Sequence, residues 1–167
     1  MSALSKSINT LAENLGRLLQ QHHLTCVTAE SCTGGALSAA ITAIPGASQW
    51  FDRGFVTYSN QAKIELLGVP QALLLTHGAV SEGCAIAMAT GAILHSQADI
   101  SVAITGIAGP AGGTVDKPVG TVWIAWAKKN TPAFASAYFF EGDRHHIREG
   151  SMKAALHGLH ALLKEDY

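Results

Sequence analysis

The chain has 167 residues, of which 48% are hydrophobic and 14% are charged. This composition predicts a single globular domain over residues 1–167 and excludes a disordered chain. The net charge of -1 excludes the basic surface that binds nucleic acids and anionic membranes, and no apolar run is long enough to span a bilayer. Three cysteines without a CxxC pair favour neither a disulfide framework nor a zinc site. The N-terminus lacks a signal-peptide core, so the sequence predicts a cytoplasmic protein.

The N-terminal half alternates helices with strands. Apolar residues recur every three or four positions from Leu4 to Leu19 and predict an amphipathic helix over 2–21. Ser59 or Asn60 is a suitable N-cap for a later helix, which places Lys63 in its first turn. The elements expected between them, in chain order, are a buried strand at 24–27, a helix at 36–44, a turn or short helix at 47–51, a strand at 54–58 and the capped helix at 59–67.

The C-terminal half continues this alternation and closes with a hairpin. The expected elements are helices at 70–75 and 82–97, a strand at 99–105, strands at 119–126 and 134–140, and a helix from Asp143 to about residue 164. The turn at 128–132 predicts that the last two strands are antiparallel. Together the elements predict a three-layer α/β/α fold around a mixed sheet of about five strands.

The stretch Thr28-Ala29-Glu30-Ser31-Cys32-Thr33-Gly34-Gly35 joins the first strand to the next helix. A turn of this kind leaves backbone N–H groups without intrahelical partners, which favours binding of an anion or a developing oxyanion. Gly34 and Gly35 allow a ligand close to the backbone, while Ser31, Cys32 and Thr33 supply nucleophile-type side chains. An ordinary capped helix start is the alternative.

Ser31 and Lys63 are the candidates for nucleophilic catalysis. A serine hydroxyl needs a base to take its proton, and a lysine with a lowered pKa can do so. Tyr58, just before Lys63, is placed to relay or steady that proton. In the alternatives, Lys63 faces solvent and pairs with an acid, or Cys32 is the nucleophile because thiols at helix N-termini have lowered pKa values. Glu30 either orients the base or satisfies backbone donors.

Other site classes find less support in the sequence. Two loops are rich in glycine, one at Gly34 and Gly35 and the other at 106–113. Neither matches a dinucleotide or Walker motif, and no GxSxG elbow surrounds Ser31. His157 and His160 share a helix face, but the scattered histidines favour solvated or capping roles over a metal site. Arg144 and Arg148, in the first turns of the last helix, are candidates to clamp a phosphate or are surface charges.

Six segments together resemble the CinA C-terminal-domain family, which includes the competence-damage-inducible protein and stand-alone nicotinamide-mononucleotide amidohydrolases. The similarity extends from about Leu11 to Leu163, with the same order and spacing. The six segments are residues 28–35, 50–60, 77–81, 105–110, 117–123 and 142–144.

The resemblance implies hydrolysis of nicotinamide mononucleotide (NMN) to nicotinate mononucleotide and ammonia, in pyridine-nucleotide salvage, without a metal or organic cofactor. It implies that Ser31 is the nucleophile and Lys63 its base, with Tyr58 alongside. The remaining implied or expected substrate contacts are Ser48, Thr105 and Arg144, the N–H groups of Cys32, Thr33 and Gly34, and the glycine-rich loops at Gly35 and Gly106.

The family resemblance also bears on assembly and on the alternative function. Family members are usually dimers or higher homo-oligomers. Four aromatic side chains near the C-terminal hairpin either form part of such an interface or fill the two faces of the sheet: Trp123, Trp126, Phe139 and Phe140. The alternative function is a non-catalytic nucleotide-binding module, in which Ser31 only caps its helix.

Overall fold

The structure is a computed structural model that describes the backbone of residues 3–164 and side chains from residue 7, so the predicted helix start at Ser2 lies outside the described residues. Its helices are α1 Ala3–His22, α2 Ala36–Thr42, α3 Asn60–Leu67, α4 Gln71–His77, α5 Glu82–Leu94 and α6 Arg144–Lys164, with a short 3-10 turn, η1, at Ala47–Gln49. Its strands are β1 Cys26–Glu30, β2 Phe51–Val56, β3 Ile100–Gly106, β4 Thr121–Lys128 and β5 Phe134–Phe139.

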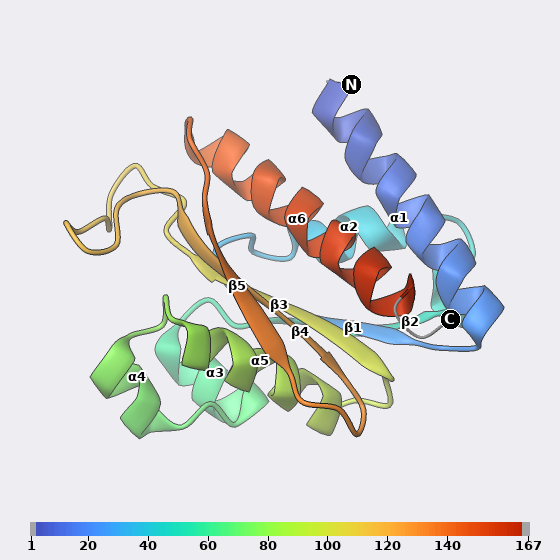
Figure 1. Cartoon of the computed structure of the whole chain (residues 1–167), viewed down its shortest axis with the longest axis horizontal. Helices are drawn as coiled ribbons and strands as arrows, with labels where there is room; N and C mark the ends of the chain where they lie inside the picture. Colours follow the sequence, from blue (N-terminus) through green and yellow to red (C-terminus); the bar gives the residue numbers. More distant parts are fainter. Residues whose placement is uncertain (1–2, 165–167) are drawn as a thin grey trace.

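The five strands form one mixed sheet between two layers of helices. The strand order is β2-β1-β3-β4-β5; β1 is parallel to β2 and β3, whereas β4 is antiparallel to both β3 and β5. Figure 1 shows α1, α2 and α6 on one face and α3, α4 and α5 on the other. The predicted α/β/α architecture and the late hairpin are therefore confirmed. No helix within residues 3–164 is long and apolar enough to cross a membrane.

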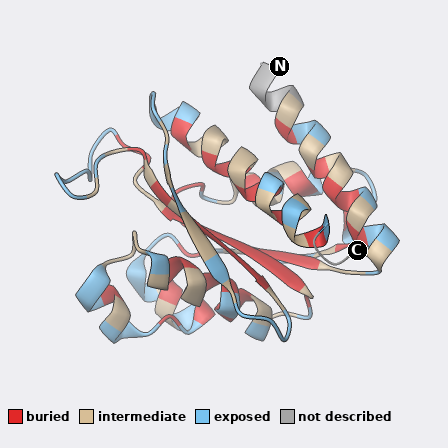
Figure 2. Cartoon of the chain, in the orientation of Figure 1, coloured by how far each residue is buried: buried red, intermediate tan, exposed pale blue. Residues whose placement is uncertain are grey.

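Both faces of the central strands are buried, and Figure 2 shows the buried colour continuing along the sheet. Side chains alternate between faces along a strand, so neighbouring residues enter different cores. Val102 and Ile104 belong to the core beneath α1 and α6, whereas Ala103 belongs to the core beneath α5. Alanines such as Ala103 and Ala125 allow α5 to pack close to the sheet.

Several predicted boundaries were wrong. The first strand is Cys26–Glu30 and not 24–27, because Thr28 and Glu30 are polar but are satisfied by hydrogen bonds to α2. The second strand begins at Phe51 and not at 54, since Phe51 pairs with Cys26. The helix predicted to reach residue 97 ends at Leu94, and the fourth strand starts at 121.

The carboxyl ends of β1, β2 and β3 meet at one edge of the sheet. There the Ser31 amide donates to the Ile104 carbonyl at 3.0 Å, and the Thr57 amide donates to the Glu30 carbonyl at 2.8 Å. Next to the sheet, α3 packs so closely on α5 that a side chain at Gly91 of α5 would overlap the backbone carbonyl of Leu67 of α3. These contacts fix the positions of the segments that carry the candidate site.

Candidate active site

Ser31 and Lys63 meet at the carboxyl edge of the sheet. Ser31 directly follows β1, and Lys63 lies in the first turn of α3. The Lys63 Nζ lies 3.0 Å from the Ser31 Oγ and donates another hydrogen bond, of 2.8 Å, to the backbone carbonyl of Thr57. The structure thus brings together the two side chains that the sequence suggests as nucleophile and base.

The amine of Lys63 is buried without a counter-ion. The residue is 1% exposed, and within residues 7–164 it forms no ion pair with a carboxylate. Burial lowers the pKa of Lys63 because it penalises the ammonium form, while the nearby thiols of Cys84 and Cys32 oppose this shift. The alternative of a solvent-facing, acid-paired lysine is therefore excluded.

The backbone around Lys63 fixes the direction of its amine. Ser59 caps α3 by accepting a hydrogen bond from the Ala62 amide at 3.0 Å, which decides between the two predicted caps. A neutral amine that donates one N–H to the Thr57 carbonyl still has a lone pair, with which it can accept the proton of the Ser31 hydroxyl. The geometry is therefore suited to activating that hydroxyl.

Glu30 satisfies the amides at the start of α2. Its buried carboxylate accepts hydrogen bonds from the Leu37 amide at 2.8 Å, the Ser38 amide at 3.0 Å and the Ser38 hydroxyl at 2.6 Å. The Gly34 amide is also occupied, because it donates to the Ser31 carbonyl at 3.0 Å. The amides of Gly34, Leu37 and Ser38 are therefore occupied within the chain, so the prediction that Gly34 offers a free amide to an anion was wrong. Of the two roles considered for Glu30, the structure shows the satisfaction of backbone donors.

Three amides of the turn, those of Cys32, Thr33 and Gly35, have no oxygen acceptor within residues 7–164. Among the described residues, the N–H groups of Cys32 and Thr33 donate to no backbone or side-chain oxygen. The buried hydroxyls of Thr33 and Thr57 also have no hydrogen-bond partner there. Because unpaired buried polar groups are uncommon in proteins, their concentration next to Ser31 indicates a place where a ligand completes the hydrogen bonding.

The thiol of Cys32 is a poor rival to the Ser31 hydroxyl. Burial raises the pKa of Cys32 to about 11, and this outweighs the lowering by a backbone amide and by Arg148 and Arg144. The lowered pKa expected for a thiol at a helix N-terminus is therefore wrong for this residue. Cys32 stays protonated at neutral pH, and only the thiolate is strongly nucleophilic.

Arg144 and Arg148 hold different positions near the turn. Arg144 is exposed and donates to the Gly109 carbonyl at 2.9 Å and to the Tyr58 hydroxyl at 3.0 Å. Tyr58 is 60% exposed, and its hydroxyl contacts Arg144 instead of the Lys63 amine. Arg148 donates from Nη2 to the Thr33 carbonyl at 2.7 Å. Arg144 thus lies at the surface beside Tyr58 and Gly109, whereas Arg148 braces the turn that carries Ser31.

Three further residues that the family resemblance implies in substrate binding, Ser48, Thr105 and Gly106, make no contact with Ser31 or Lys63 that the structure records. Ser48, in η1, precedes β2 and therefore lies at the amino edge of the sheet, opposite the edge that carries Ser31. Thr105 is 1% exposed, and its hydroxyl donates to a backbone carbonyl in the loop before α5. Gly106 packs against β4 with no room for a side chain. The single chain does not bring Ser48 to the pair, and the three substrate contacts stay predictions.

The fold and the site together define a class of protein: an α/β domain with a buried lysine and serine pair at a strand-to-helix turn. The family model of the CinA C-terminal domain matches residues 8–163, and the chain belongs to this family.

Curated relatives and solved structures agree with this assignment. The nicotinamide-nucleotide amidohydrolase PncC of Escherichia coli K12 is 48% identical over 149 residues, which cover 89% of this chain and 90% of PncC. A putative competence-damage inducible protein of Symbiobacterium thermophilum is 51% identical over 158 residues, which cover 90% of this chain but only 36% of that longer protein. The crystal structure of the competence/damage inducible protein CihA from Agrobacterium tumefaciens matches with a TM-score of 0.93 at 43% identity, over 97% of this chain and 99% of that one.

The buried amine predicts a pH-dependent difference in stability between the wild type and Lys63→Met. Because the folded-state pKa of Lys63 is lowered, the unfolded chain binds more protons between that value and the unfolded value of about 10.4. The free energy of unfolding of the wild type relative to Lys63→Met should therefore rise with pH in this window, by about 1.4 kcal/mol for each pH unit of it.

Urea denaturation from neutral pH to pH 10 measures this difference, from which contributions common to both proteins, including the cysteines, cancel. Lys153→Met on α6 is the matched control for loss of a lysine charge. A difference that stays flat or falls with pH would contradict the lowered pKa of Lys63.

Proposed function

We propose that this chain hydrolyses the carboxamide of NMN, with water, to nicotinate mononucleotide and ammonia. The observation that carries the proposal is the 3.0 Å contact between the buried Lys63 Nζ and the Ser31 Oγ. The name of the similar PncC supports the choice of substrate. A mere binding module would gain nothing from burying an unpaired amine beside a hydroxyl, because that burial costs free energy.

In the proposed acylation step, the Ser31 Oγ attacks the carboxamide carbon while the neutral Lys63 amine takes the hydroxyl proton. The tetrahedral intermediate then collapses, the carbon–nitrogen bond breaks, and the Lys63 ammonium returns a proton to the departing ammonia. The result is an ester between Ser31 and the nicotinoyl group. Burial supports this assignment, because it lowers the pKa of Lys63 and so favours the neutral amine that the attack needs.

In the proposed deacylation step, a water molecule replaces ammonia. Lys63 accepts a proton from that water as its oxygen attacks the ester carbon, and then returns the proton to the Ser31 oxygen as the ester bond breaks. Nicotinate mononucleotide leaves and the pair is regenerated. These steps use only side chains and backbone groups of the chain itself.

The developing oxyanion needs donors that are already in place. The N–H groups of Cys32 and Thr33 are the proposed donors, since they lie directly after Ser31 and have no oxygen acceptor among the described residues. The carboxylate of Glu30 supports the role indirectly by holding α2, and with it the end of the turn, through three hydrogen bonds. The oxyanion site is thus assigned to two amides and not to the start of α2.

Arg144 is the proposed contact for the phosphate of the nucleotide. It is exposed, and its guanidinium is held by the Gly109 carbonyl and the Tyr58 hydroxyl. A planar guanidinium held in this way can present its remaining N–H donors to phosphate oxygens. Arg148 fits this role less well, because it is partly buried and bonded to the Thr33 carbonyl.

A homodimer or higher homo-oligomer in the cytoplasm is proposed as the working form, with neither nucleic acid nor membrane as partner. Any contact of Ser48 with the nucleotide requires a second copy of the chain, because Ser48 lies at the edge of the sheet opposite Ser31. Exposed apolar side chains at Val56 and Phe139 offer surface for such a copy. Three free, buried cysteines suit a reducing compartment, and the net charge of -1 provides no attraction for nucleic acid.

Replacing either member of the pair should abolish turnover. Ser31→Ala removes the nucleophile and Lys63→Met removes the base, so each should lower the kcat for ammonia release from NMN by at least about a thousandfold. Ammonia release can be followed with a coupled assay, and NMN binding by calorimetry. Ser136→Ala on β5 and Lys153→Met on α6 are the matched controls. Near wild-type rates in Ser31→Ala or Lys63→Met would refute the proposed mechanism, and binding without turnover in the wild type would favour the binding module.

Arg144→Ala should weaken binding of the phosphate without impairing the chemical step. Loss of a charge-assisted hydrogen bond of about 1.5 to 3 kcal/mol predicts a KM for NMN raised by about 10- to 100-fold, with kcat largely retained. Nicotinamide riboside lacks the phosphate, so its kcat/KM should change little. Arg17→Ala on the exposed face of α1 is the matched control. An unchanged KM for NMN would remove Arg144 from the phosphate site.

A further inference from the structure

The strand β5 ends the sheet and has one unpaired backbone edge. It is the last strand in the order β2-β1-β3-β4-β5 and pairs only with β4, residue by residue from Phe134 to Phe139. Among the described residues, the backbone groups on its other side have no hydrogen-bond partner. This edge is therefore free to bond to another strand.

The register shows which backbone groups of β5 point outward. The Phe140 amide, directly after the strand, donates to the Gly120 carbonyl at 2.9 Å, so this residue bonds toward β4. In an antiparallel pair the bonded residues recur at every second position. The even-numbered residues of β5 therefore bond to β4, and the outward N–H and C=O groups are those of Ala135, Ala137 and Phe139.

The outer edge of β5 lacks the features that keep edge strands apart. Soluble proteins usually protect such edges with charged side chains, prolines or bulges. The opposite edge strand, β2, carries Asp52 and Arg53, and its pairing with β1 shifts register between Cys26 and Val27. The sequence of β5, FASAYF, has no charge and no proline, and its pairing is regular. Unlike β2, this strand is suited to further pairing.

The outward groups of β5 match those of a second copy that runs antiparallel to it. When Ala137 faces Ala137 of the second copy, Ala135 faces Phe139 and Phe139 faces Ala135. Each of these three pairs exchanges an N–H and a C=O. Phe139, which is 60% exposed, then lies over a small alanine, and Tyr138 lies beside Ser136. A shift by two residues would leave one of the three pairs unmade.

The order of charges around β5 favours the same antiparallel arrangement. Lys128 and Lys129 precede the strand, whereas Glu141 and Asp143 follow it. Antiparallel pairing brings the acidic end of each copy beside the basic end of the other, and parallel pairing would bring like charges together. Opposite charges across paired strands are stabilising, and like charges are destabilising.

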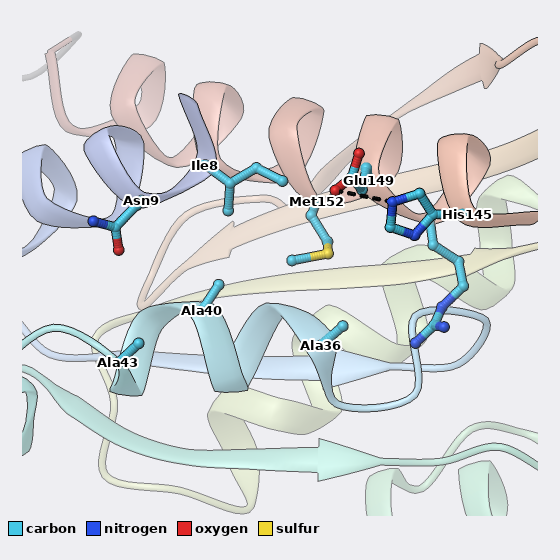
Figure 3. Close-up of a pocket in the computed structure, with 9 residues that line it drawn as sticks. Ile8, Asn9, Ala36, Ala40, Ala43, His145, Glu149 and Met152 are labelled. Carbon is cyan, nitrogen blue, oxygen red and sulfur yellow. Dashed lines mark ion pairs between the residues drawn. The ribbon is translucent and has the colours of Figure 1, made fainter. Parts of the chain in front are cut away.

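Neighbouring charges reduce this difference between the two ends without reversing it. At the basic end, Lys129 also pairs with Asp99 at 3.6 Å. At the acidic end, Arg144 follows the two carboxylates in the sequence. Figure 3 shows His145 and Glu149 paired with each other on α6, at 3.3 Å, so the Glu149 carboxylate already has a partner within the chain.

We propose that β5 is the interface of a two-fold dimer, in which a second copy of this chain adds its own β5 antiparallel, with Ala137 at the axis. The two sheets then form one continuous sheet through the dimer. The proposal specifies an interface for the homo-oligomer proposed above and rests on it, but it does not depend on the amidohydrolase.

This dimer keeps the two proposed active sites separate. The axis reverses the strand direction, so the carboxyl edges of the two copies face opposite ways. The strand β2 and the neighbouring Ser48 lie at the far ends of the joined sheet. The interface through β5 is therefore distinct from any contact that brings Ser48 to a nucleotide in another copy.

Charges placed at the axis test the interface and its register together. Ala137→Lys puts two like charges face to face and should raise the dissociation constant of the assembly about fivefold or more, and Ala137→Glu should do the same. An equimolar mixture of the two variants pairs opposite charges and should restore wild-type affinity. Ala137 is exposed, and a charge at a free edge is compatible with folding of the single chain. Ala72→Lys, at an exposed position of α4, is the matched control and should associate normally.

Sedimentation velocity over a dilution series of each protein gives these dissociation constants. A wild type that stays monomeric, or a mixture that associates no better than either variant alone, would overturn the proposed interface. Unchanged association of both Ala137 variants would also overturn it and would leave a homo-oligomer formed through another surface. Ammonia release from NMN by the same wild-type samples tests the amidohydrolase separately, because β5 carries neither Ser31 nor Lys63.

Discussion

The burial of the Lys63 amine, which has no carboxylate partner within residues 7–164, is the constraint on which the site depends. A lysine removed from water is driven toward its neutral form, and the neutral form is the one that can take a proton from a hydroxyl. A carboxylate beside Lys63 would stabilise the ammonium and make the pair inert. The chain instead gives the amine a backbone carbonyl, at Thr57, and the hydroxyl of Ser31.

The rest of the fold keeps that amine and that hydroxyl in place. Parallel pairing of β1 with β2 and β3 brings Ser31 and Thr57 to one edge, and close packing of α3 on α5 fixes the helix that carries Lys63. The Glu30 carboxylate accepts hydrogen bonds from the Leu37 and Ser38 amides at the start of α2, so these amides are not available to a ligand. Within residues 7–164, the turn amides without an oxygen acceptor are those of Cys32, Thr33 and Gly35, and the proposed oxyanion donors are among them.

Local signals in the sequence were sufficient for the fold and only in part for the site. Apolar periodicity, Pro45 and the later hairpin turn predict the elements, because these features act within a few residues. The end of β1 was missed because Thr28 and Glu30 look polar, and their partner Ser38 becomes visible only once α2 packs on the sheet. The predicted lowering of the Cys32 pKa was wrong for a related reason, since the burial that raises this pKa is a property of the tertiary structure. The placement of Ser48 and Ser31 at opposite edges likewise depends on the parallel direction of β1 and β2 and not on spacing in the sequence.

Direct titration of Lys63 tests the central claim most closely. Carbon-13 labelling of the lysine side chains, with Lys63→Met to assign the signal, gives the pKa of this amine in the folded protein by NMR. The account predicts a pKa below the ordinary lysine value of about 10.4, because burial penalises the ammonium form. A pKa at or above that ordinary value would show a permanently charged lysine and would contradict the account.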